Sequence, residues 1–324
     1  MPGLILLSVG IAAVMGGIFC IGVIIMSKAA RKSMPSSVSG GGALDAGSKD
    51  GLPAIDESIE NVSASTNHFL QKHPSYIVIP LVVVIVLEAI FILASARDPR
   101  VYVAPLILPL IGYSIARNRI QHEFMKQFAS ANGFSYTPGG SLDGLDGSLF
   151  QIGNSRSVAD VVSGQFQNRP ISLFTYTYVT GSGKSEQTHT YTIYELQFDV
   201  TLPDILLENA SHAFGGSLFE KLSGKEFIKL EGDFNKYFSL CIPRGYETEA
   251  LEIFTPDVME ELIEKAKAFS LEIVNGHLFI YNNGTVGTKQ GLYDLYALAQ
   301  YFIEKLGPVL ARMKPSVEAM EQFK

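Results

Sequence analysis

The sequence predicts an integral membrane protein in which three transmembrane helices are joined to a soluble α+β domain with a mainly antiparallel sheet. Long apolar runs fill the first third of the chain, and the whole chain is 47% hydrophobic with a mean hydropathy of +0.21. The later residues alternate β-branched and aromatic side chains, as strands do. We therefore divide the chain into a first transmembrane helix (1–26), a flexible Gly/Ser-rich linker (27–75), a transmembrane helical hairpin (76–116) and a soluble domain (117–324).

The hairpin at 76–116 consists of two apolar runs joined by a short turn. Residues 77–96 carry one charge, Glu88, and about 20 apolar residues at 1.5 Å each cross a hydrocarbon core of ~30 Å. The second run, 101–116, is shorter. It contains two prolines, which a membrane helix tolerates when its neighbours satisfy the freed carbonyl groups. The alternative is a buried helical hairpin in a globular core, and the length of both runs favours the membrane.

The first apolar run, 4–26, has no basic residue before it. A signal peptide would have a basic start and a shorter apolar stretch, so we favour a retained helix. Small residues recur every fourth position from Ser8 to Cys20. This pattern permits close approach of another helix, although ordinary Gly and Ala usage explains it equally well. We therefore expect the lipid bilayer as one partner and oligomerisation through the spans as a further contact.

Basic residues predict the orientation of these spans. With three spans, the linker and the soluble domain share one side of the membrane, and most flanking Lys and Arg residues lie on that side. The positive-inside rule then places the soluble domain in the cytoplasm and the N-terminus outside the inner or plasma membrane. If 101–116 does not span, the linker and the domain fall on opposite sides.

The soluble domain shows several local structural signals. The spacing of apolar residues predicts a helix over 115–131, and strands are predicted at 170–179 and 187–200 with a hairpin loop between them. Thr255 and Pro256 are typical of a helix start. The pair Asn275-Gly276 between apolar runs predicts a type I′ hairpin. A terminal helix is expected over 292–314, bent near 307–308.

No motif reaches a catalytic, cofactor or metal signature. The GSGKS segment at 181–185 lacks the first glycine of a phosphate loop and precedes a strand rather than a helix, so it is read as a hairpin tip. The six histidines show no metal-ligand spacing, and His189 is read as a cross-strand partner. The net charge is −7, and residues 117–324 alone account for it. An acidic domain argues against nucleic acid as a partner. We predict no catalytic residue, no cofactor and no metal.

Glu88 is the residue that we single out as a candidate polar site. A carboxylate within a span costs roughly 2.5–3.5 kcal/mol on insertion scales, so such groups are protonated, paired or hydrated. In a tight hairpin its depth matches that of Tyr113 and Ser114, which could donate hydrogen bonds. Structural pairing is favoured, and a proton or ion pathway and tolerance near the interface are the alternatives.

The segment from Leu230 to Tyr281, with its Gly-Asp-Phe and Phe-Thr-Pro-Asp stretches, resembles a family of uncharacterised bacterial integral-membrane proteins with a cytosolic domain of unknown function. The segment LFTYTYVTGSGKSEQTHTYTIYEL is similar as well. The resemblance implies a bacterial source. It implies no activity, so no site residue follows from it.

Three functions remain open at this point. We favour a membrane-anchored interaction or scaffold protein whose cytoplasmic domain binds a protein partner, rather than an enzyme. The second is an accessory subunit of a transporter or channel. The third is a membrane-bound enzyme of unknown class, which would need a concave pocket with converging polar groups.

Overall fold

A computed structural model describes residues 61–72, 82–83, 86, 104–198, 204–211, 225–230, 232–245 and 247–308. Its centre is a nine-stranded sheet in the order β1-β2-β3-β4-β9-β8-β5-β7-β6, in which every neighbouring pair of strands is antiparallel. The strands are β1 (Ser135–Gly140), β2 (Asn154–Phe166), β3 (Arg169–Thr180), β4 (Gln187–Gln197), β5 (Ile205–Asn209), β6 (Lys225–Ile228), β7 (Phe238–Pro243), β8 (Phe269–Val274) and β9 (His277–Asn283).

Tight turns with positive φ at both central residues connect the strands of two hairpins. Asn275 and Gly276 join β8 to β9 with φ values of 49° and 76°, so the predicted type I′ hairpin is confirmed. Gln167 and Asn168 join β2 to β3 with φ values of 48° and 61°. This second turn also has positive φ at both central residues, but glutamine is not a residue type that predicts such a turn.

The helices are α2 (Val62–Lys72), α4 (Ala104–Ala131), α6 (Glu247–Ile253), α7 (Pro256–Ala266) and α8 (Lys289–Tyr301), which continues into the π-helical segment η5 (Phe302–Leu306). The start of α7 at Pro256, directly after Thr255, agrees with the sequence prediction. The predicted helix over 115–131 is the later part of α4. The sheet, α7, α8 and the part of α4 from Arg117 onward belong to one compact unit.

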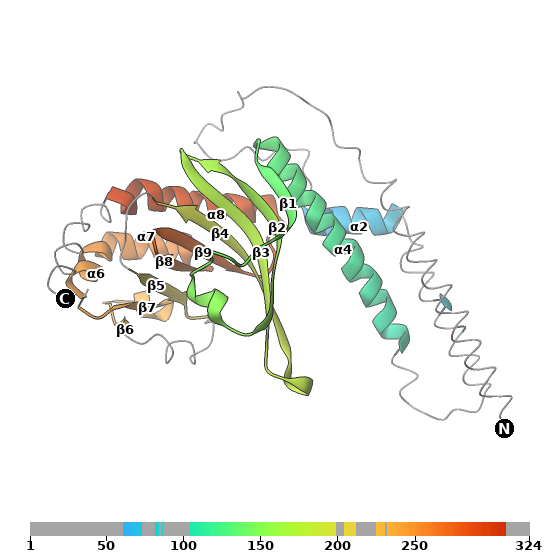
Figure 1. Cartoon of the computed structure of the whole chain (residues 1–324), viewed down its shortest axis with the longest axis horizontal. Coiled ribbons are helices and arrows are strands. Elements are labelled where there is room, and N and C mark those ends of the chain that lie inside the picture. Colours follow the sequence, from blue (N-terminus) through green and yellow to red (C-terminus); the bar gives the residue numbers. More distant parts are fainter. Residues whose placement is uncertain are drawn as a thin grey trace. The chain divides into compact units, whose positions relative to one another are not determined.

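One face of the sheet packs against helices. Figure 1 shows α7 and α8 lying along this face. Phe124 and Phe128 of α4, Leu262 of α7 and Tyr296 of α8 are buried in one core with side chains of β2, β3, β4, β5, β7, β8 and β9. Phe124 and Phe128 are four residues apart, so both lie on the face of α4 that meets the sheet.

The other face of the sheet is covered by a loop instead of helices. Residues 141–153, which we call the cover loop, include the short 3-10 helix η2 (Ser148–Gln151). Leu149 and Phe150 of η2 are buried against a second core of sheet residues. That core contains Val158, Phe174, Tyr176, Tyr178, Tyr191, Ile193, Leu206, Cys241, Val274, Phe279 and Tyr281.

The predicted fold class of three transmembrane helices beside a soluble α+β domain is wrong. A nine-stranded antiparallel sheet dominates the structure, and within the described ranges no helix is long and apolar enough to cross a membrane. The apolar run 101–116 was read as a span, but its helical part begins at Ala104 and continues into the charged half of α4. From Ala104 to Ala116 the helix extends roughly 20 Å, against the ~30 Å of a hydrocarbon core.

The predicted integral-membrane location is wrong as well, because no described helix could cross a membrane. The predicted orientation falls with it, because the positive-inside argument depended on the spans. The predicted span 4–26, the linker up to residue 60 and nearly all of the predicted span 77–96 lie outside the described residues. Oligomerisation through such spans has no support in the part of the chain that the structure describes.

Candidate functional site

The hairpin formed by β3 and β4 extends past the rest of the sheet (Figure 1). On one side, β2 accompanies β3 as far as the pair Asn154↔Val179. On the other side, β9 pairs with β4 only from Thr192 onward, apart from a bridge between Tyr191 and Gly284. Residues 177–190, which we call the arm, therefore project beyond the helix-packed part of the sheet.

Stacked rings hold the base of the arm. Tyr178 stacks on His189 across the hairpin with ring centroids 4.8 Å apart and on Tyr191 at 6.1 Å. The His189 Nε2 lies 2.7 Å from the Thr180 Oγ1. Offset stacking of this kind adds about 0.5–1.5 kcal/mol per pair beyond area burial. His189 is thus a cross-strand partner, as the sequence predicted.

The tip of the arm is ordered by its own hydrogen bonds. Gly181 and Gly183 adopt φ values of 79° and 58°, which only glycine adopts without strain. The 3-10 turn η3 (Gly183–Ser185) leads into β4. The Ser185 N–H donates to the Ser182 C=O at 3.2 Å. The Ser185 Oγ also donates to the Ser182 C=O at 2.9 Å. All residues from 181 to 188 are exposed, so this order does not come from packing.

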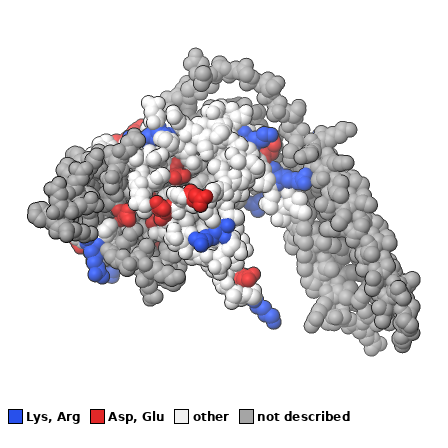
Figure 2. Space-filling model, viewed as in Figure 1, with Lys and Arg blue, Asp and Glu red and all other residues white. Residues whose placement is uncertain are grey.

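The arm carries charge only at its tip. Burial raises the pKa of the Tyr178 hydroxyl, which donates to the Tyr191 hydroxyl. Burial also raises the pKa of Tyr176 to about 12, against a smaller opposing effect of Arg156. These phenols are therefore neutral at physiological pH. Figure 2 shows acidic and basic colour close together at the end of the arm, where the sequence has Lys184 and Glu186.

Glu272 forms the most deeply buried polar cluster on the loop-covered face. Its carboxylate accepts hydrogen bonds from the Ser148 N–H at 2.8 Å, the Ser148 Oγ at 2.5 Å and the Tyr281 hydroxyl at 2.7 Å. The residue is 1% exposed. Because these donors occupy both carboxylate oxygens and solvent is excluded, the cluster fastens the cover loop to β8 and β9 rather than binding a substrate.

Ser172, Glu195 and His277 form a second cluster across β3, β4 and β9. The Glu195 Oε1 lies 2.8 Å from the His277 Nδ1, and Ser172 is hydrogen-bonded to the same carboxyl group. Burial raises the pKa of Glu195, and His277 and Ser172 oppose this rise. In a serine hydrolase the histidine stands between the serine and the acid. Here the acid stands in the middle, so the histidine cannot activate the serine.

Asp160 lies at a bulge of β2 with a φ of 53° and is 3% exposed. Its carboxylate accepts from the Tyr136 hydroxyl at 2.8 Å and bonds the His122 Nδ1. An acid that orients an imidazole is half of a general-base arrangement. No hydrogen bond joins the other His122 nitrogen to a Ser, Thr or Cys among the described residues, so the cluster ties α4 to β1 and β2.

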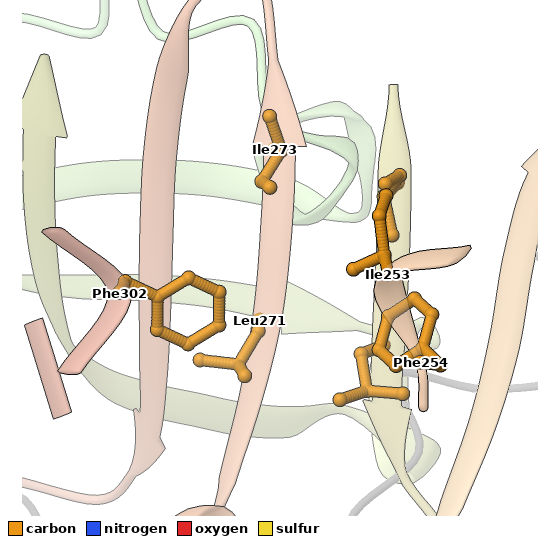
Figure 3. Close-up of a pocket in the computed structure, with 7 residues that line it drawn as sticks. Ile253, Phe254, Leu271, Ile273 and Phe302 are labelled. Carbon is orange, nitrogen blue, oxygen red and sulfur yellow. The ribbon is translucent and has the colours of Figure 1, made fainter. Parts of the chain in front are cut away.

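A small apolar cavity lies between β5, β8, the end of α6 and the start of η5 (Figure 3). Its volume is about 20 Å³, and its walls are Ile205, Leu207, Ile253, Phe254, Leu271, Ile273 and Phe302. That is near the space of one water molecule, and no side chain of the wall offers a hydrogen bond. The cavity is a packing defect and not a substrate pocket, because ligand pockets are of the order of 300–1,000 Å³.

Of the polar site predicted from the sequence, the structure describes two of the three residues. Glu88 lies outside the described residues. Tyr113 and Ser114 lie in α4, half-buried and exposed respectively. Their hydrogen bonding to Glu88 stays a prediction. In the ranges that the structure covers, no group of three or more His, Cys, Asp or Glu side chains is placed to hold a metal ion.

Sequence reasoning identified the loop 181–185 as a hairpin tip, which is confirmed. It missed the arm, because the projection depends on where β9 stops beside β4, some 90 residues later in the chain. The alternation of Thr with Tyr and His in 175–192 was a usable signal. It shows one face made of rings and the other of hydroxyl groups.

Comparison with known proteins gives one structural likeness. No family model matches the chain, and no curated protein matches it. Among solved structures, the chain is similar to the mycobacterial trehalose monomycolate transport factor A, TtfA, with a TM-score of 0.43 and 13% sequence identity. The alignment covers 59% of this chain and 97% of that chain. The resemblance to a bacterial membrane-protein family and the role of an accessory transport subunit both stay predictions.

Proposed function

We propose that this chain is a protein-interaction or scaffold protein and that the arm, residues 177–190, is its contact element. The observation that carries the proposal is an exposed hairpin that is ordered without burying its tip. Folding gains little from such a projection, since ordering each residue costs about 1–2 kcal/mol and burial returns nothing at the tip. A partner that binds the arm is spared this ordering cost, so a pre-ordered element favours affinity.

The chemistry of the remaining polar groups supports binding rather than catalysis. Glu272 and Asp160 are used in fastening the cover loop and α4. The described cavity near Phe302 has the volume of about one water molecule and an apolar wall. The arm, in contrast, offers exposed backbone, hydroxyl groups and a pair of opposite charges at its tip.

Site-specific photo-crosslinking tests the proposal. A photoreactive amino acid replaces Lys184 at the tip in the full chain, expressed in cells of the source organism. The matched control carries the same amino acid in place of Lys265, an exposed lysine of α7. We expect one protein species, identified by mass spectrometry, to crosslink from position 184 and not from position 265.

A competition experiment completes the design. An untagged chain in excess should reduce the crosslink, whereas a chain with Lys184→Glu and Glu186→Lys should compete less well, because the tip charges are exchanged. Equal crosslinking from positions 184 and 265, or none from 184, would contradict the proposed role of the arm.

A further inference from the structure

Thr188 directs its backbone N–H and C=O away from β3. The Gly284 N–H donates to the Thr190 C=O at 2.8 Å, on the side of β4 where β9 lies. Successive residues of a strand send their backbone groups to opposite sides. Thr188, two residues before Thr190, therefore points its N–H and C=O to the β9 side, while His189 between them pairs with Tyr178 of β3.

This side of β4 is an open strand edge over residues 187–189, where Thr188 is the residue that faces outward, because the C=O of Thr190 is already bonded to Gly284. The pairing with β9 covers Thr192 to Gln197 and ends with the bridge from Tyr191 to Gly284. Thr188 is exposed, and no strand of the described chain other than β3 pairs with it. An unpaired strand edge is a template for another extended chain.

The two faces beside this edge differ in chemistry. Rings of His189 and Tyr191 lie on one face, and the hydroxyl groups of Thr188 and Thr190 lie on the other. A strand placed next to β4 alternates its side chains between these faces. It would present apolar or aromatic groups to the rings and small polar groups to the threonines.

We propose that an extended segment of the partner protein adds to this edge as a strand, in line with β9. The inference rests on the proposed function and names its binding mode. A partner segment is favoured because β9 already fixes the neighbouring row of hydrogen bonds, so that a new strand continues an existing sheet. Such additions draw affinity from main-chain hydrogen bonds and specificity from alternate side chains.

Thr188→Pro is the discriminating variant. Proline removes the outward N–H and leaves the pairing with β3, because that N–H does not point to β3. Thr188→Val is the matched control, since it keeps the N–H and the branched side chain. Thermal unfolding of both variants checks that the arm is retained.

The probe is a linear 12-residue peptide selected by phage display against the full chain and then synthesised. We expect its dissociation constant to rise about tenfold or more in Thr188→Pro, because one to two main-chain hydrogen bonds are lost. In Thr188→Val the dissociation constant should rise less than about threefold. Peptides N-methylated at alternate residues give a second readout that needs no variant. One alternation should abolish binding and the other should preserve it, because a strand uses every second amide.

Equal affinity for Thr188→Pro and the unaltered chain, or equal effects of both N-methyl series, would overturn strand addition. So would a selection that yields no peptide dependent on Thr188. Concentration-dependent dimers that Thr188→Pro abolishes would assign the edge to a second copy of this chain instead. If the crosslink from position 184 persists in Thr188→Pro, the arm keeps its proposed role and only strand addition fails.

Discussion

Gly153 shows how a single residue fixes the base of the arm. Its φ is 66°, and a Cβ atom at this position would lie 2.5 Å from the Val179 carbonyl oxygen and 2.6 Å from the Tyr178 ring. The end of the cover loop can approach β3 this closely only because no side chain intervenes. Gly144, in the same loop, has a φ of 81° but nothing within 4 Å of its missing Cβ.

We expect Gly153→Ala to destabilise the chain more than Gly144→Ala. The second variant carries only the left-handed strain of about 1–2 kcal/mol, whereas the first adds a backbone clash of the kind that costs about 1–3 kcal/mol. Urea unfolding of both variants measures the difference. Equal losses would show that the cover loop does not press against β3.

Glu195 illustrates a residue whose environment opposes its charged form. Burial outweighs the attraction of His277 and raises the pKa of Glu195 above its usual value of 4.5. The folded chain therefore holds this proton more tightly than the unfolded chain does. The stabilisation that Glu195 supplies is complete below pH 4.5 and is lost as pH rises through the folded-state pKa.

Glu195→Gln removes this titration. We expect the free energy of unfolding of the variant, relative to that of the unaltered chain, to increase as pH rises from about 4.5 toward neutrality. Denaturant unfolding across that range measures this difference. The same two chains in a His277→Asn background separate the effect of the imidazole from that of burial. A difference that stays constant with pH, or decreases, would contradict the burial of this carboxyl group.

At the scale of elements, the two late helices start differently although both follow a threonine. The Thr288 hydroxyl accepts from the Gly291 N–H at 3.1 Å and caps α8. Thr255, before α7, makes no side-chain cap hydrogen bond. Both residues stand at the N-cap position that the side-chain preference predicts, but only one performs the capping contact.

We expect Thr288→Ala to lower the free energy of unfolding by about 0.5–2 kcal/mol, the usual value of a lost cap. Thr255→Ala should change it by less than about 0.5 kcal/mol, since no hydrogen bond is removed. Chemical denaturation of the two variants makes the comparison. A loss at Thr255 equal to that at Thr288 would refute the assignment of the two caps.

Local signals account for the elements that the sequence predicted. Asn275-Gly276 and Thr255-Pro256 act over a few residues, so their turn and helix start were readable. Glu272 and Ser148 lie 124 residues apart, and their contact depends on the pairing of β5, β8 and β9, which no local pattern encodes. The turn at Gln167-Asn168 was missed because Gln has no special preference for positive φ.

For the whole molecule, the main error came from hydrophobicity taken without its structural setting. The run 101–116 is apolar enough to suggest a span, yet its helix continues through Arg117 to Ala131 and its later part packs on the sheet. The sheet itself buries one face under helices and the other under the cover loop. The tip of the arm, residues 181–188, is exposed outside both layers, which is why we assign the contact function to the arm.

Amide hydrogen exchange of the full chain without any partner tests this account most directly. Exchange read residue by residue by NMR should show the His189 N–H protected, because it faces β3, and the adjacent Thr188 N–H exchanging freely at the open edge. Protection of His189 beside an unprotected Thr188 is the result that a pre-ordered arm with a free edge predicts. Rapid exchange at both positions would contradict it, since the arm would then have no fixed hairpin to offer a partner.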